Sequence, residues 1–139
     1  MALDGGGGGG GGPVGVSNSF TGTAGTLELV GNHCFAYSGA FDITDTSEHQ
    51  LLSFTTGNYY SVVDFTFWRR SWEDDDIAFY VKMNGTQVLA YIARVSEPQG
   101  TNIQPVIMPP FTQIDAYVDK QVHNYGSKVG INITGRVYA

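Results

Sequence analysis

Charge is what this sequence lacks most. Charged residues make up 14% of its 139 residues, against about 25% in a typical soluble domain. Ser, Thr, Asn, Gln, Gly and Tyr must therefore cover much of the surface. Two interpretations fit this composition. The outer face either packs against neighbouring proteins, where ion pairs are costly to desolvate, or belongs to a secreted β-domain with a wet polar surface.

Basic residues are especially scarce, and the net charge is −6. Direct binding of nucleic acid needs clustered Lys and Arg that displace counterions from the phosphates. Arg69 and Arg70 are the one adjacent basic pair, and an acidic run at 73–76 follows them. We therefore expect no direct nucleic-acid contact.

Cysteine and long apolar runs are also rare. Cys34 is the single cysteine, which excludes an intrachain disulfide. Its place in a strand-like run favours a small buried apolar residue over a nucleophile. No apolar run approaches the roughly 18 residues of a membrane span, and the N-terminus lacks the basic and apolar regions of a signal peptide. We expect a soluble protein with no membrane span and no secretion by the ordinary route.

Glycine, in contrast, is abundant near the N-terminus. Gly5 to Gly12 form an unbroken run that Pro13 closes. Such a run has no side chains to bury and the largest backbone entropy to lose, and no Gly-Lys-Ser/Thr ends it as in a phosphate-binding loop. The sequence predicts a flexible arm over residues 1–25 that threads between neighbouring subunits, followed by a folded domain over residues 26–139.

The folded part has a hydrophobic period of two, and no stretch favours a helix. Predicted strands cover residues 26–30, 33–44, 50–55, 60–68, 77–83, 86–95, 103–108, 112–119 and 129–137. Their alternation predicts a shared core of Phe65, Phe67, Phe79, Val81, Ile114, Ile131 and Ile133.

Turn signals separate these strands. Asn84-Gly85 predicts a hairpin, because a type I′ turn needs positive φ at both central residues. Pro109 and Pro110 predict an edge or a corner, since two prolines do not fit a central strand. Eight or nine short strands without helices predict an antiparallel two-sheet sandwich or a small barrel. Strand number and length favour a single jelly roll, with an immunoglobulin-like sandwich as the main alternative.

Candidate catalytic groups are few and scattered. His33, His49 and His123 have no metal-ligand spacing. Asp42 and Asp64 lie in predicted strands and are the candidates for a glycosidase-like carboxylate pair. No glutamate lies in a comparable strand, where a jelly-roll glycosidase would usually carry one. We expect no enzyme.

The acidic run at 73–76 offers oxygen ligands of the kind that calcium takes. Consecutive carboxylates point in diverging directions, however, and the spaced acidic pattern of a calcium loop is absent. A solvated turn is the favoured interpretation. We expect no cofactor and no metal.

Aromatic residues give the better clue to function. Several Tyr and Trp residues fall on strand faces opposite the apolar ones, which suits a protein–protein interface and suits sugar stacking equally well. The alternative is that both faces of some strands are buried. The candidate interface residues, including those of the arm, are Trp68, Trp72, Tyr80, Tyr117, Tyr138, Gly5, Gly12 and Pro13.

Three stretches of the C-terminal half carry a resemblance to a known group of proteins. They are residues 79–89 around Asn84-Gly85, residues 107–112 with the sequence Ile-Met-Pro-Pro-Phe-Thr, and the closing residues 131–138 with Thr-Gly-Arg-Val-Tyr. In this order they resemble the Asn-Gly hairpin, Pro-Pro-Phe-Thr corner and closing strand of small viral jelly rolls. These are the single jelly-roll pentons, minor capsid proteins and decoration (cement) proteins of DNA viruses and tailed phages.

The resemblance implies a structural virion component. Such a capsid subunit assembles with itself, as a pentamer or trimer, or with other capsid proteins. It is soluble in the host cell before assembly and then lies in the capsid shell. The alternative is a carbohydrate- or receptor-binding jelly roll, such as a tail-tip or lectin-like domain.

Overall fold

The computed structural model describes residues 25–70, 76–94, 100–123 and 126–138, which form strands joined by turns and contain no helix. No membrane-spanning helix therefore occurs in these residues. The all-β prediction is confirmed. The strands are β1 (Glu28–Val30), β2 (His33–Tyr37), β3 (Phe41–Ile43), β4 (His49–Thr55), β5 (Tyr60–Arg70), β6 (Ile77–Met83), β7 (Thr86–Ala93), β8 (Gly100–Met108), β9 (Gln113–Lys120) and β10 (Ser127–Tyr138).

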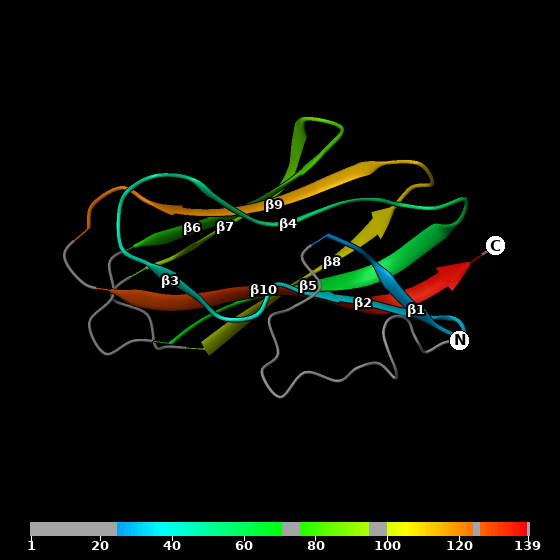
Figure 1. Cartoon of the computed structure of the whole chain (residues 1–139), viewed down its shortest axis with the longest axis horizontal. Helices are drawn as coiled ribbons and strands as arrows, with labels where there is room; N and C mark the ends of the chain where they lie inside the picture. The colour runs from blue at the N-terminus through cyan, green and yellow to red at the C-terminus, as the bar shows by residue number, and fades with distance from the viewer. Residues whose placement is uncertain (1–24, 71–75, 95–99, 124–125, 139) are drawn as a thin grey trace.

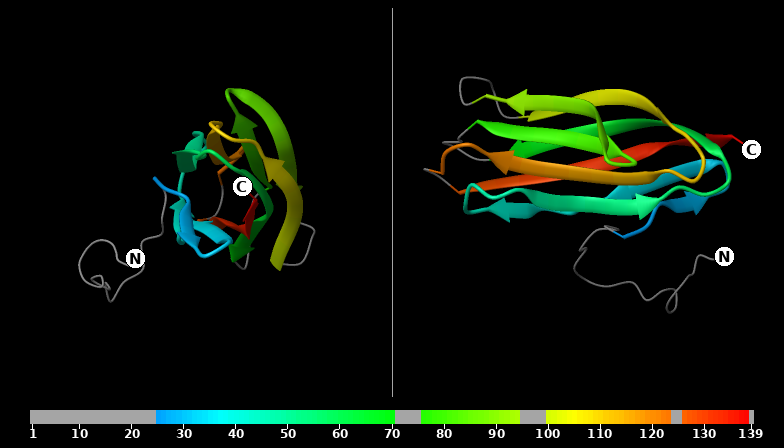
Figure 2. Two further views of the ribbon diagram at one scale, coloured as in Figure 1. Left: turned by 90° about the vertical axis from the view of Figure 1, so that its right-hand side faces the viewer. Right: turned by 90° about the horizontal axis from the view of Figure 1, so that it is seen from above.

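Two antiparallel sheets lie face to face as two layers (Figure 1). The first sheet has the order β1-β2-β10-β5-β8, and β3 also pairs with β10. The second sheet has the order β4-β9-β6-β7, and its strands lie side by side when seen from above (Figure 2, right). The predicted two-sheet antiparallel sandwich is therefore correct.

The core lies between the two sheets, where alternate residues of the long strands point inward. Phe67 of β5 stacks against Phe79 of β6, with ring centroids 5.2 Å apart, and so joins the two layers. Every predicted core residue is at most 1% exposed. This group comprises Phe65, Phe67, Phe79, Val81, Ile114, Ile131 and Ile133.

The predicted hairpin joins β6 to β7, and Met83 pairs with Thr86 across it. Asn84 and Gly85 have φ angles of 51° and 83°, as a type I′ turn requires. Asn84 also anchors the hairpin to β9. Its backbone N–H donates to the Gln113 carbonyl, and its side-chain oxygen accepts from the Gln113 N–H.

The predicted corner follows β8, which ends just before Pro109 and Pro110. Thr56, at the end of β4, ties this corner down. Its hydroxyl donates to the Pro109 carbonyl at 2.6 Å and accepts from the Thr112 N–H at 2.8 Å. The Thr56 side chain thus provides hydrogen-bond partners for two backbone groups of the corner, the Pro109 carbonyl and the Thr112 N–H.

One predicted strand is wrong in its extent. Residues 33–44 form two strands, β2 and β3, because Gly39 has a φ of 76° and turns the chain between them. Ser38 keeps the break attached to β10, since its N–H donates to the Ile131 carbonyl and its hydroxyl accepts from the Ile131 N–H. Residues 1–24, which include most of the predicted arm with Gly5, Gly12 and Pro13, lie outside the described residues, as does Trp72.

Candidate binding surface

The outer face of the first sheet carries an exposed apolar strip along β5 and β8. Ile103 and Ile107 of β8 are each 57% exposed, and Val62 of β5, directly opposite Ile107, is 46% exposed. Pro105 lies between the two isoleucines on the same face and is also exposed. We call these four residues the β8 strip. A contiguous exposed apolar patch of this kind is typical of an interaction site.

Three of the four residues of the β8 strip lie on β8, an end strand of the described sheet (Figure 2, left). Proline is tolerated on edge strands where its missing N–H faces away from the neighbouring strand. Pro105 therefore interrupts the row of backbone donors on the free side of β8 and disfavours the addition of another strand. A partner would therefore contact the side chains of the β8 strip more than the backbone of β8.

A shallow polar groove of about 370 Å³ lies beside the β8 strip, over the middle of the same sheet. Strands β2, β10 and β5 line it, and they lie next to one another in the sheet (Figure 1). The residues that line this polar groove are His33, Cys34, Phe35, Tyr37, Asp64, Thr134, Gly135 and Arg136.

The predicted interface residues are distributed over both sheets. Tyr80 and Tyr117 are partly buried on the outer face of the second sheet, where their rings stack with centroids 5.1 Å apart. Lys82 lies over both rings. Burial, with a smaller contribution from Asp115 and Glu48, raises the pKa of the Tyr117 hydroxyl. These two tyrosines therefore cover each other.

Trp68 and Tyr138 lie on the first sheet. Trp68 is partly buried, and its indole occupies the space next to Gly130 of the neighbouring strand β10, where a Cβ atom would otherwise lie. Tyr138 is half exposed and pairs with Tyr60, which is two residues from Val62 on the same strand face. Of the candidates within the described chain, Tyr138 is the one that extends the β8 strip.

The three exposed aliphatic side chains of the β8 strip are Val62, Ile103 and Ile107. None of them was among the predicted interface residues. Sequence analysis looked for outward aromatics, whereas the strip is mainly aliphatic. Ile103 and Ile107 belong to an alternating run, and alternation alone does not say which face is inward. The available signal was Pro105, which marks an edge strand.

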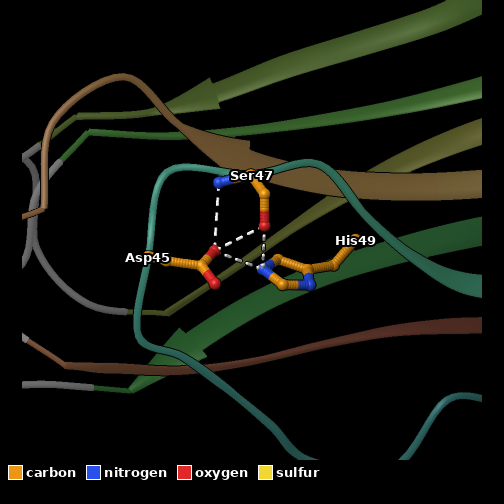
Figure 3. A network of polar contacts seen from close by, with 3 residues as sticks. All are labelled: Asp45, Ser47 and His49. Carbon is orange, nitrogen blue, oxygen red and sulfur yellow. Dashed lines mark hydrogen bonds and ion pairs between the residues drawn. The ribbon is translucent and has the colours of Figure 1, made fainter.

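Asp45, Ser47 and His49 come together in the loop before β4 and at its start, as Figure 3 shows. The Ser47 hydroxyl donates to Asp45 Oδ1 at 2.6 Å, and His49 Nε2 lies 2.8 Å from the same oxygen. The Ser47 hydrogen bonds, followed by that of His49, lower the pKa of Asp45 to about 2.

This cluster has the residue types of a hydrolase triad without its geometry. A catalytic histidine contacts serine with one ring nitrogen and the carboxylate with the other. Here the same nitrogen, Nε2 of His49, contacts both Ser47 and Asp45. The Ser47 hydroxyl donates its hydrogen bond to Asp45. The imidazole also packs on Phe41, with ring centroids 4.8 Å apart. The arrangement holds a loop, and the one ring nitrogen that approaches Ser47 is the nitrogen that also contacts Asp45.

The other candidate catalytic groups stay apart. Asp42 of β3 lies opposite Lys128, whereas Asp64 of β5 lies opposite Thr134, six residues further along β10. Six residues of a strand span about 20 Å, too far for a glycosidase pair. Cys34 is buried, and burial raises the pKa of its thiol. Within the described parts of the chain, no cluster of three or more His, Cys, Asp or Glu residues is placed to hold a metal.

The basic pair of the sequence also separates. Arg70 is exposed, whereas Arg69 points inward and is 5% exposed. The Arg69 guanidinium donates to the carbonyls of Ala93 and Arg94, at the end of β7. Arg69 therefore connects the two sheets at one end of the sandwich and forms no basic surface with its neighbour.

Asp119 of β9 has an unfavourable environment for its charge. Its Oδ1 atom is buried and accepts no hydrogen bond within the described structure. Burial, followed by the charge of Glu48, raises the pKa of the Asp119 carboxyl. The folded protein therefore binds a proton at Asp119 more tightly than the unfolded chain does.

Asp119→Asn is expected to raise the melting temperature at neutral pH. Because the folded pKa is raised, ionised Asp119 lowers stability above that pKa. The penalty disappears as the pH falls toward the unfolded value of 3.8. Thermal unfolding of both proteins across this range measures the effect, and the gain should shrink with acidification.

Asp115→Asn is the matched control, because Asp115 lies on the same strand and accepts hydrogen bonds from Ser53 and Gln113. It should lower the melting temperature. A neutral-pH loss of stability in Asp119→Asn would contradict the assignment.

No protein-family model matches the sequence, and a search of curated proteins finds no significant match.

Proposed function

We propose that the chain is a single jelly roll that serves as a structural component of a virus particle. It acts as a penton, minor capsid or cement subunit, and it assembles with itself or with other capsid proteins through the β8 strip and the glycine-rich arm. The observation that carries the proposal is the exposed aliphatic strip on a chain with few charges. The sequence resemblance to viral jelly rolls gives it its biological setting.

The strand order supports the jelly roll. Eight of the strands form two sheets of four, β2-β10-β5-β8 and β4-β9-β6-β7. The chain passes from one sheet to the other at most connections, and the first of these strands, β2, lies beside the last, β10. Two Greek keys folded over each other give such an order, and viral capsid and lectin domains use it. An immunoglobulin-like sandwich instead places its first, second, fifth and fourth strands in one sheet.

The β8 strip supports assembly. A free monomer would leave the apolar side chains of Val62, Ile103 and Ile107 in water, and burying them against a neighbour would be favourable by about 25 cal/mol per Å². Tyr60 and Tyr138 continue this surface and add aromatic area, which is enriched at interfaces. Asp64 and Arg136 lie directly opposite Pro105 and Val62 and form the polar margin of this surface, as is usual around the apolar centre of an interface.

The double variant Ile103→Ser/Ile107→Ser is expected to weaken assembly at least about thirty-fold. Truncating a buried interface anchor typically costs about 2 kcal/mol or more. Size-exclusion chromatography with light scattering over a concentration series measures self-association. Co-sedimentation with purified virus particles measures incorporation of the protein. Mass spectrometry of virus particles isolated from the same biological source tests whether they contain the protein.

Val88→Ser/Ile92→Ser is the matched control, because these residues are 44% and 46% exposed on β7 of the other sheet. It should assemble like the unmodified chain. A chain that stays monomeric and is absent from the particles would contradict the proposal, and so would equal losses in both double variants.

A carbohydrate- or receptor-binding role is the second candidate function. The observation that favours it is the polar groove, which combines aromatic rings with exposed donors and an acceptor. The β8 strip does not take part in this groove, so the two functions are separable by mutation.

A further inference from the structure

The polar groove gathers several exposed polar side chains from three neighbouring strands of the first sheet. His33 and Arg136 lie directly opposite each other on β2 and β10, and Asp64 lies opposite Thr134 on β5 and β10. All four side chains are exposed on the outer face. Directly opposite residues on one face of a sheet have Cβ atoms about 5 Å apart. These four side chains therefore lie around a patch of the sheet that is about as wide as one small ring-shaped molecule.

Asp64 and Arg136 remain available to a ligand. Elsewhere on this sheet an exposed carboxylate does find a cation, since Lys128 Nζ lies 2.9 Å from Asp42 Oδ1. Within the described structure, Asp64 and Arg136 make no ion pair or side-chain hydrogen bond, although they are diagonal neighbours on the same face. An acceptor and a donor that have no partners within the described residues thus lie diagonally opposite each other on the same face of the sheet.

Aromatic rings form the apolar side of the groove. Phe35 and Tyr37 are partly buried on β2, and their ring centroids lie 5.1 Å apart with an angle of 37° between the rings. The face of an aromatic ring is electron-rich, so it attracts C–H groups that carry a partial positive charge. An apolar wall with a small number of placed polar groups is the usual composition of a small-molecule site.

The composition of the groove selects among ligand classes. Asp64 and the net charge of −6 disfavour phosphate groups and nucleic acid. Binding of a peptide as an added strand needs a free sheet edge, whereas β10, at the centre of the groove, has strands on both sides. A sugar ring fits all the groups present. Its C–H face packs on the rings, and its hydroxyls donate to Asp64 and accept from Arg136.

We propose that the polar groove binds a neutral sugar ring, with Phe35 and Tyr37 as the stacking surface and Asp64 and Arg136 as hydrogen-bonding partners. The groove covers one side of the ligand, so a single hexose should bind with a dissociation constant near 1 mM, about the weak end of specific binding. A longer glycan that extends along the sheet should bind more tightly. This inference rests on the second candidate function given above, whose ligand class it specifies, and it is independent of the proposed assembly.

The test is titration of the isotope-labelled full chain with glucose, galactose, mannose and lactose, followed by amide chemical shifts in NMR. Saturable shifts are expected at residues 33–37 and 134–136 and at Asp64. Asp64→Asn and Arg136→Gln should each weaken binding by about tenfold or more, because each replaces a charged hydrogen-bonding group by a neutral one. Both positions are exposed, and circular dichroism checks that the variants keep their fold.

Asp42→Asn and Lys128→Gln are matched controls, because each likewise replaces a charged side chain by a neutral amide, in an ion pair elsewhere on this sheet. They should leave sugar binding unchanged, as should Ile103→Ser/Ile107→Ser. No saturable shift with any neutral sugar would overturn the proposal, and so would binding that survives both groove substitutions. Binding confined to sialylated or sulfated glycans, and strengthened by Asp64→Asn, would also overturn it in favour of an anionic ligand.

Discussion

Phe67→Ala is expected to lower the free energy of unfolding by about 3–5 kcal/mol, the usual effect of removing a buried aromatic ring. Phe67 is 1% exposed at the centre of the sandwich. Its ring stacks on Phe79 and lies parallel to Tyr91, with centroids 5.2 and 6.4 Å away. Because these partners belong to the other sheet, the substitution opens a cavity between the two layers that neither sheet can close alone.

Urea unfolding followed by circular dichroism measures this loss, and the slope with denaturant should stay unchanged. Phe111→Ala is the matched control, because the Phe111 ring is 67% exposed at the Pro-Pro corner. Its effect should stay within about 0.5 kcal/mol. A loss below about 1 kcal/mol for Phe67→Ala would mean that the two sheets repack and close the cavity. That result would contradict the prediction, which assumes the dense and rigid packing that is usual in protein interiors.

Gly135→Ala is expected to cost about 1–3 kcal/mol or more, although it adds a single methyl group. A Cβ atom at Gly135 would lie 2.6 Å from the Cα atom of Val63 and closer still to the Val62 carbonyl oxygen. Both obstacles are backbone atoms of the paired strand β5. No rotamer change relieves the overlap, so β10 and β5 have to separate where they pair.

Gly130→Ala provides the informative comparison on the same strand. A Cβ atom there would overlap the Trp68 indole, and a side chain can move where backbone cannot. The cost of Gly130→Ala should therefore become small in a Trp68→Ala background, whereas that of Gly135→Ala should persist. Gly126→Ala, with nothing within 4 Å of the added atom, serves as the control. Denaturant unfolding of the set measures these differences, and a Gly135→Ala variant as stable as Gly126→Ala would refute the close strand contact.

The fold class followed from the sequence because its signals are local. Alternation in 60–68 placed Phe65 and Phe67 inward, and Asn84-Gly85 specified the φ angles of its own turn. The single strand expected over 33–44 was wrong for the same kind of reason. One residue, Gly39, reverses the local conformation without breaking the hydrophobic pattern on either side.

The candidate binding surface could be predicted from the sequence much less well than the fold class. The sequence favoured outward aromatics, yet Tyr80 and Tyr117 cover each other and Trp68 covers Gly130. Their mutual contacts depend on which strands are neighbours, and neighbouring strands are far apart in the chain. The polar groove is a clearer case still, because it combines β2, β5 and β10, whose groups are separated by up to about a hundred residues.

The sequence by itself determined that this protein is a β-sandwich, which residues fill its core, and where its main hairpin and corner lie. Each of these depends on a period of two or on the backbone preferences of Gly, Asn and Pro, which act within a few residues. The tertiary structure alone decided that Ile103 and Ile107 stay exposed and that Asp64 and Arg136 are diagonal neighbours on one face. Strand order and register set those relations, and both arise from long-range pairing that no local pattern encodes.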